Sequence, residues 1–414
     1  MALRNSAAAD APHTGWGQTP VVDLPTGWGQ TPGIGRLDPV IVQPRVAEIP
    51  KGPKHALCVG ASPATLLHDM RSIPISILTV AALLSFAATH HVAAQQSATV
   101  GIVDFYGLRQ ITEAQVRQAL RIVEGDTITE STLRSAEKRL RALPGVSDAR
   151  VDGVCCDSGK TLVYVGIEEK GTPALRFNPP PKGNARLPDD VVRAGAAFDA
   201  AFEKAMARGD FQEDQSQGHS LMRDQGARAV QEGFVALADR HGPQLREVLR
   251  DSNKPEQRAL AAQVLGYATD KASVVGDLSS AMRDPDADVR NNATRALWII
   301  AALARKAPDR KIQVPAAPFV ELLNSLTWTD RNKSSLALMS LTESREPALL
   351  SSLREKAVPA LAEMARWKNR GHAIAPMMIL GRVAGIPESE LASAAQIGSH
   401  AIIVDAALKR LESK

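Results

Sequence analysis

An internal repeat in the second half of the chain constrains the fold more than any other feature of the sequence. The pattern of Leu245–Asp251 returns 33 residues later in Leu278–Asp284, and the segments that begin at Arg258 and Arg290 match at an offset of 32. Each unit reads as helix, turn, helix with one apolar stripe per helix. A single pair of helices cannot cover its own apolar face, whereas stacked pairs bury a continuous core. The repeat therefore predicts an all-α region of stacked helical pairs.

The repeat continues with units of uneven length. Leu322–Met339 aligns with Leu361–Met378 at an offset of 39, and the sequence Asp-Pro-Asp-Ala-Asp-Val-Arg of Asp284–Arg290 joins two units. Over about residues 227–385 this pattern resembles HEAT-type repeats. The resemblance implies an all-α HEAT-like solenoid, an ARM-like superhelix, over 227–414. The alternative is an irregular helical domain without a regular superhelix.

The composition agrees with closely packed helices. Aromatic residues make up only 4% of the chain, so alanine and the aliphatic residues have to build the cores. The net charge of +4 arises from 49 basic and 45 acidic residues without a dense basic block. This balance indicates no nucleic-acid partner and no direct attraction to a membrane surface.

Residues 1–69 lack any helical or strand period. The heptapeptide Thr-Gly-Trp-Gly-Gln-Thr-Pro occupies 14–20 and recurs at 26–32, among prolines and glycines. Such a segment cannot bury enough apolar surface to offset the entropy of ordering. We therefore expect 1–69 to be a disordered or mis-annotated N-terminal extension.

Residues 70–94 have the three parts of a signal peptide. Met70 and a basic residue precede the apolar run Ile73–Ala88, and small residues end the segment at Ala94. The pattern predicts cleavage between Ala94 and Gln95 and export to the periplasm or cell envelope. If the residues before Met70 are translated, the same run becomes an uncleaved signal anchor instead.

Residues 98–170 predict a small α+β module of order β-α-α-β-β. Alternation in Thr99–Phe105 indicates a strand, and Thr112 suits the N-cap of a first helix. A second helix, capped by Thr129 or Ser131, ends at a Pro-Gly pair. Two further strands are expected, joined by a turn-rich segment around residues 155–159. These strands are Val146–Val151 and Leu162–Ile167.

Several short motifs in this module, taken in order, resemble a POTRA domain. They are Val-Asp-Phe-Tyr-Gly (103–107), Ile-Thr (111–112), Gly-Asp (125–126), Leu-Pro-Gly-Val (143–146) and Val-x-Val-x-Ile-Glu-Glu (163–169). The resemblance implies a polypeptide-binding module in the envelope of a double-membrane bacterium, usually placed before an outer-membrane β-barrel. No run of alternating strands of about ten residues follows here, so we expect no barrel from this sequence. An unrelated small α+β domain is the alternative.

Two segments connect the module to the repeats. Residues 171–188 include the Phe-Asn-Pro-Pro-Pro-Lys-Gly stretch and predict a stiff, Pro-rich linker. Residues 189–226 predict a helix over Val191–Met206, followed by a loop or frayed joint over Gly209–Gly226.

No catalytic or metal-binding motif is recognisable in the sequence. Metalloprotease, nucleophile-elbow, phosphate-loop and dinucleotide signatures are missing, and the four histidines after Gln95 are widely spaced. The alternating Asp284, Asp286 and Asp288 lack the glycine and glutamate of a calcium loop, so we expect helix-capping acids there. The sequence thus predicts a protein that is not an enzyme, without catalytic residues, cofactor or metal.

Cys155 and Cys156 form a candidate disulfide. Two adjacent thiols do not supply the ligands of a metal site. In an oxidising compartment they would form either a strained vicinal disulfide or bonds between chains. Mass measurement with and without reductant distinguishes these states, and two free thiols would contradict both.

The resemblances together predict a non-enzymatic adaptor in the envelope that binds proteins. In POTRA domains the second strand lies at the sheet edge, so the candidate binding residues are Val146, Ser147, Asp148, Ala149, Arg150 and Val151. A proline at Ala149 is expected to weaken capture of an extended partner. Membrane association is expected only through a partner or an uncleaved anchor. The alternatives are an accessory factor in outer-membrane protein assembly or export that acts with a separate β-barrel, and an enzyme accessory or lyase-type repeat protein.

Overall fold

The computed structural model describes residues 17–18, 97–210 and 212–413. The candidate cleavage site at Ala94 and Gln95, the apolar run before it and most of the N-terminal extension lie outside the described residues. The side chains of Cys155 and Cys156 do as well. No helix in the described ranges is both long and apolar enough to cross a bilayer.

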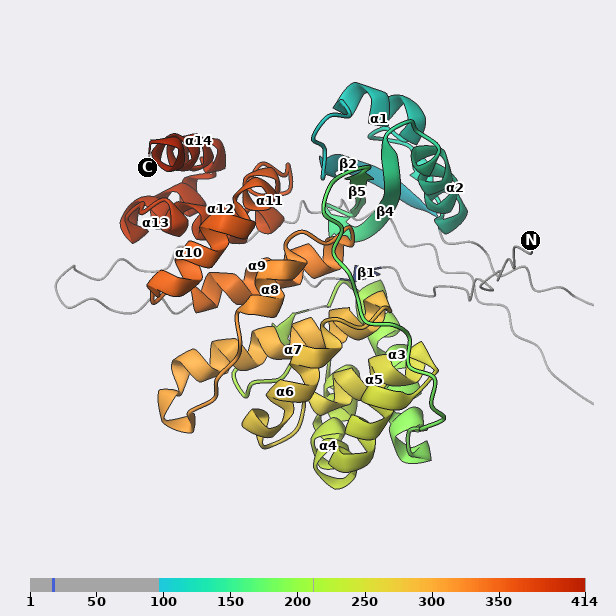
Figure 1. The fold of residues 1–414 in the computed structure, drawn as a ribbon. Helices are drawn as coiled ribbons and strands as arrows, with labels where there is room; N and C mark the ends of the chain where they lie inside the picture. The colour runs from blue at the N-terminus through green and yellow to red at the C-terminus, as the bar shows by residue number, and fades with distance from the viewer. Residues whose placement is uncertain (1–16, 19–96, 211, 414) are drawn as a thin grey trace, which may run out of the picture. The chain divides into compact units, whose positions relative to one another are not determined.

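The first part of the described chain is a small mixed sheet with two helices, in the expected order β-α-α-β-β plus two short extra strands (Figure 1). The sheet order is β1-β4-β5-β2-β3, with β2 parallel to β5 and β4 antiparallel to β5. The elements are β1 (Gly17–Gln18), β2 (Ala98–Tyr106), α1 (Glu113–Leu120), β3 (Thr127–Ile128), α2 (Glu130–Arg141), β4 (Val146–Asp157) and β5 (Lys160–Glu169).

Local sequence signals explain where these elements begin and end. The side chain of Thr112 caps α1, and Thr129, one of the two expected candidates, caps α2. The turn between β4 and β5 is shorter than expected, because β4 continues to Asp157. Ser158 and Gly159 both have positive φ, which allows a tight hairpin turn at this point.

Strand β5 is buried on both faces. Val163, Val165 and Ile167 belong to the core that the sheet shares with α1 and α2. Leu162 and Tyr164 belong instead to the core of the helical region. Side chains alternate across a strand, so the two faces of this sheet are covered by different helices. Figure 1 shows α1 and α2 on one side of the sheet.

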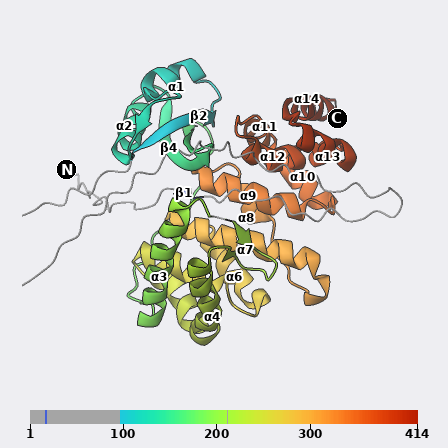
Figure 2. The same ribbon diagram turned by 180° about the vertical axis from the view of Figure 1, so that it is seen from behind.

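The rest of the described chain is mostly helical, which confirms the arrangement of an α+β module followed by an all-α region (Figure 2). The helices are α3 (Asp189–Ala207), α4 (Gln225–Asp251), α5 (Pro255–Leu265), α6 (Lys271–Ala281), α7 (Ala287–Lys306), the 3-10 turn η1 (Pro308–Arg310), α8 (Ala317–Leu322), α9 (Trp328–Leu341), α10 (Pro347–Lys356), α11 (Val358–Met364), α12 (Arg370–Val383), α13 (Glu388–Ile397) and α14 (His400–Glu412).

The segment Gly209–Gly226, expected as a loop, contains a short hairpin. Strands β6 (Glu213–Asp214) and β7 (Leu221–Met222) pair antiparallel. The hairpin is held by the helical region: Tyr267 Oη, in the turn after α5, donates to the Ser220 carbonyl at 2.8 Å. These tertiary contacts, and not any local strand pattern, order the segment.

Arginines near the starts of three helices make the same contact in successive units. Each donates to the backbone carbonyl six residues earlier and faces a carboxylate of the following unit. The first two of these arginines, Arg258 and Arg290, are separated by the 32-residue offset of the sequence repeat. The three sets are Arg258 with Ser252 O and Asp284, Arg290 with Asp284 O and Asp330, and Arg331 with Ser325 O and Glu363.

Of the acids between the units, Asp286 caps a helix as expected, whereas Asp284 forms an ion pair. Asp286 is the N-cap of α7, and its carboxylate accepts from the Asp288 and Val289 amides. Its neighbour Asp284 accepts two hydrogen bonds from Arg258, each 2.8 Å long. Helix capping and ion pairing therefore account for the contacts that Asp284 and Asp286 make.

The Pro-rich linker lies against the helical region. The Arg290 guanidinium stacks over the Phe177 ring at 3.7 Å from its centroid. The Asn178 amide donates to the Arg283 carbonyl at 2.8 Å. Gly183 approaches Asp251 so closely that a Cβ atom would lie 1.9 Å from its carboxylate. The linker is thus a packed part of the fold.

Candidate protein-binding surfaces

The sheet face opposite α1 and α2 meets the helical region through large aromatic side chains. Tyr164 stacks on Trp328, with ring centroids 5.0 Å apart, and contacts Trp367 at 4.9 Å. Tyr106 packs edge-on against Trp367 at 6.1 Å. The chain has only three tyrosines and five tryptophans. Four of these eight residues meet at this interface.

Both tyrosine hydroxyls are paired across the interface. Tyr106 Oη donates to the Leu326 carbonyl at 2.7 Å, and Tyr164 Oη lies 2.6 Å from His372 Nδ1. Burial raises the pKa of the Tyr164 hydroxyl and lowers the pKa of His372 to about 4. Near neutral pH the hydroxyl is therefore the donor and Nδ1 the acceptor, which places the imidazole proton on Nε2.

Carboxylates of the sheet hold backbone amides at the helix starts. Asp152 accepts from the Trp328 amide, the first of α9, at 3.0 Å. Asp104 accepts from the Lys368 amide, just before α12, at 2.9 Å. Helix N-termini leave amides unpaired and favour negative charge. These bonds close the second sheet face to any other partner.

The edge of the sheet at β2 is also covered. Strand β3 pairs with the start of β2. Further along, the Val103 amide donates to Glu124 at 3.4 Å, and the Val103 carbonyl accepts from Lys368 Nζ at 2.9 Å. An added strand would have to displace both side chains.

The edge at β4 contains the candidate residues Val146–Val151. Within this stretch, two amides that point away from β5 are already occupied. The Ala149 amide donates to Asp148 at 2.8 Å, and the Val151 amide donates to Glu137 on α2 at 2.9 Å. Carboxylates that cap an edge in this way guard it against strand addition. The predicted binding stretch is thus the protected half of the edge.

Among the side chains that the structure describes, none caps an amide in the second half of β4. There β1 pairs in parallel with β4, with Gly17 opposite Val154 and Gln18 opposite Cys155. An extended segment therefore does add at this part of the edge. The candidate disulfide residues Cys155 and Cys156 belong to the same part of β4.

The histidines are dispersed, as their spacing suggested, and three of them have separate partners. His219 Nδ1 lies 3.1 Å from Lys271 Nζ, and His241 Nε2 lies 2.9 Å from Asp190. His372 bonds to Tyr164, and burial lowers the pKa of His400. No group of three or more potential metal ligands occurs among residues 97–210 and 212–413.

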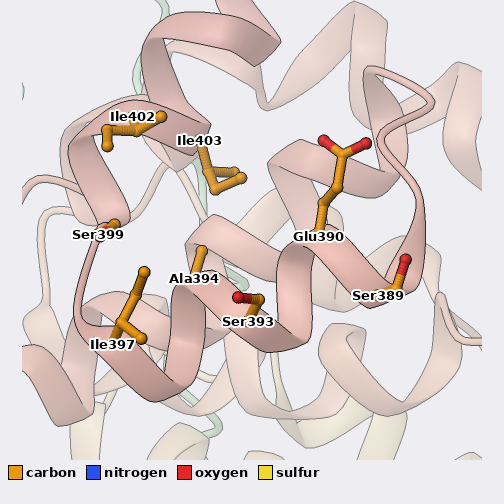
Figure 3. Close-up of a pocket in the computed structure, with 8 residues that line it drawn as sticks. All are labelled: Ser389, Glu390, Ser393, Ala394, Ile397, Ser399, Ile402 and Ile403. Carbon is orange, nitrogen blue, oxygen red and sulfur yellow. The ribbon is translucent and has the colours of Figure 1, made fainter.

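A shallow groove lies between the last two helices (Figure 3). Its volume is about 370 Å³. Figure 3 shows Glu390, Ala394 and Ile397 along α13, and Ile402 and Ile403 on α14. Ile397 and Ile402 are 71% and 68% exposed. Exposed large apolar residues beside a groove are typical of protein-binding surfaces.

Sequence reasoning missed the buried polar helix α9. Asp330, Lys333 and Ser334 are all almost fully buried, although their sequence reads as a solvated face. Lys333 donates to Asn291, and burial lowers its pKa to about 7. The repeat alignment pairs Asp330 with Asn369, which is only half-buried, so the alignment did not signal this burial.

Neither a scan against protein-family models nor a search of curated proteins finds a match for this chain.

Proposed function

We propose that the chain is a non-enzymatic adaptor of the cell envelope that binds extended protein segments. In this proposal residues 98–170 are a POTRA-like module and residues 227–414 a HEAT-like solenoid. The mixed sheet order of β4-β5-β2 and the recurring arginine contacts in α5, α7 and α9 support these two assignments.

The observation that carries the proposal is that an extended segment, β1, pairs with the outer side of β4. Both faces of the sheet are packed against helices, and the β2 edge is covered by β3, Glu124 and Lys368. An incoming extended segment would then pair its backbone with β4, in place of β1. The caps on Ala149 and Val151 direct it to the stretch that begins at Gly153.

A role in outer-membrane protein assembly or export, together with a separate β-barrel, is the second candidate. The same β4 edge would serve it, with a strand of the client or of the barrel protein as the occupant. Co-purification of the full chain with a barrel protein favours this role over a general adaptor.

In-cell photocrosslinking tests the edge directly. A photoreactive residue at Asp157 is expected to crosslink to partner protein, whereas one at Glu412 is not. Gly153→Pro removes an outward backbone donor and is expected to abolish the crosslinks at Asp157. Ala149→Pro, which the sequence alone marked as disruptive, is expected to spare them, because Asp148 already holds that amide.

Circular dichroism of each variant checks that the fold is retained. Crosslinks at Asp157 that persist in folded Gly153→Pro would show that binding does not use the β4 edge. A loss in Ala149→Pro together with an intact Gly153→Pro would place the partner on the capped half instead.

A further inference from the structure

Four arginines gather around the end of α12, where the chain leaves the helix through Gly385 with φ of 74°. Three of them donate to backbone carbonyls at this point. Cationic donors at a helix C-terminus satisfy free carbonyls and complement the helix dipole. Each of these bonds uses one donor group of a guanidinium that has five. The bonds are Arg345 Nη2 to Ile386 O (2.7 Å), Arg354 Nη2 to Val383 O (3.0 Å) and Arg410 Nη1 to Gly385 O (3.4 Å).

The fourth arginine, Arg382, is fully buried and is satisfied internally. It forms a paired contact with Glu388, from Nη2 to Oε1 at 2.6 Å and from Nε to Oε2 at 3.1 Å. Glu388 also accepts from Arg345 at 3.1 Å. The nearby Glu346 is occupied as the N-cap of α10, where it accepts from two backbone amides. One carboxylate thus serves two arginines, and positive charge remains in excess.

Arg345 and Arg354 carry this excess. Their Nε and Nη1 groups donate to no residue that the structure describes. The Arg345 side chain is 31% exposed, and Arg354 is exposed. Both therefore present unused donors to solvent, from side chains that are each fixed by a backbone contact.

These donors border a hollow of about 320 Å³ between α10 and the end of α12. Pro347, Leu350 and Val383 supply its apolar lining, beside Arg345 and Arg354. A guanidinium matches the planar, two-oxygen geometry of a carboxylate. The hollow therefore combines unused guanidinium donors from two arginines with room for an aliphatic side chain.

We propose that this hollow binds an acidic peptide segment of a partner protein. An Asp or Glu carboxylate of the segment lies between Arg345 and Arg354, and a neighbouring aliphatic residue packs on Leu350 and Val383. The positive excess supplies the charge complementarity, and the apolar lining favours a peptide over a bare phosphate ion. This site is independent of the β4 edge and would remain if edge binding were refuted.

The test uses the full chain and two fluorescein-labelled hexapeptides. One alternates leucine and glutamate, and the other carries glutamine in place of glutamate. Fluorescence anisotropy is expected to show that the acidic peptide binds about tenfold more tightly than the glutamine peptide. This is the difference expected when one charge-assisted hydrogen bond is lost. Arg354→Gln keeps a donor for the Val383 carbonyl but removes the charge, and should weaken the acidic peptide about tenfold.

Arg250→Gln is the matched control, since Arg250, like Arg354, is an exposed arginine on a helix of this region, but its charge is paired with Asp277. It should leave binding unchanged. Equal binding of the two peptides, or equal weakening by both substitutions, would overturn the proposal. Inorganic phosphate is the third arm. If phosphate displaces the acidic peptide when the two are present at equal concentration, the site recognises any oxyanion. The proposed specificity for a peptide is then wrong.

Discussion

Replacing Arg290 with methionine tests whether the arginine contacts hold the helical units together. Arg290 is 2% exposed, and its guanidinium donates to Asp330 at 2.9 Å. Asp330 is fully buried, and one of its oxygens already lacks a partner. Arg290→Met leaves this carboxylate with only the Ser325 hydroxyl, at 2.6 Å.

The cost follows from the uncompensated charge. Removing one partner of a buried ion pair typically destabilises a protein by about 3–5 kcal/mol. Burial already raises the pKa of Asp330 even with Arg290 present. Without Arg290 the pKa of Asp330 rises further. At pH values above the usual carboxyl pKa, Asp330 is then protonated more in the folded state than in the unfolded state. The loss of stability in the variant should therefore be smaller at acidic than at alkaline pH.

Urea denaturation followed by circular dichroism measures the change. Arg283→Met is the matched control, because Arg283 and Glu321 form an exposed pair, with side chains 53% and 36% exposed. Exposed pairs contribute roughly 0–1 kcal/mol. Adding Asp330→Leu to Arg290→Met should recover much of the stability, since it removes the unpaired carboxylate.

A loss below about 1 kcal/mol in Arg290→Met, or no recovery in the double variant, would refute this reasoning. Either result would mean that the arginine contacts are incidental to the stacking of the units.

Three further results are expected. The pKa of His372 is about 4 in the folded state, against the usual 6.5. Between these two pH values the unfolded state binds more protons than the folded state. The free energy of unfolding should therefore fall by up to about 3 kcal/mol as the pH drops through this range. His372→Gln should flatten that dependence in denaturation curves measured from pH 7 to pH 4. Leu265→Asp and Leu297→Asp each bury a carboxylate, and hydrogen exchange should lose protection in adjacent units; a loss confined to one helix would argue against stacking. N-terminal sequencing of native protein should begin near Gln95, and recovery of Met1 would exclude cleavage there.

The sequence by itself determined the local structure and the class of the fold. Thr112 and Thr129 marked two helix starts because capping is a contact between near neighbours. Alternation predicted the strands that became β2 and β5, and the repeat predicted a helical second half. Each of these signals acts within a few residues or recurs at a fixed spacing, so no knowledge of distant contacts was needed.

Only the tertiary structure decided which surfaces are covered and which polar groups are buried. The sequence pointed to Val146–Val151 as a binding edge, but the Glu137 carboxylate that caps Val151 comes from a different element. Tyr164 and His372, 208 residues apart, meet only because the sheet packs on α12. Likewise, Asp330 and Lys333 read as solvated until neighbouring helices enclose them. Burial and the partners of polar groups depend on which elements pack together, and the spacing of residues along one segment does not contain that information.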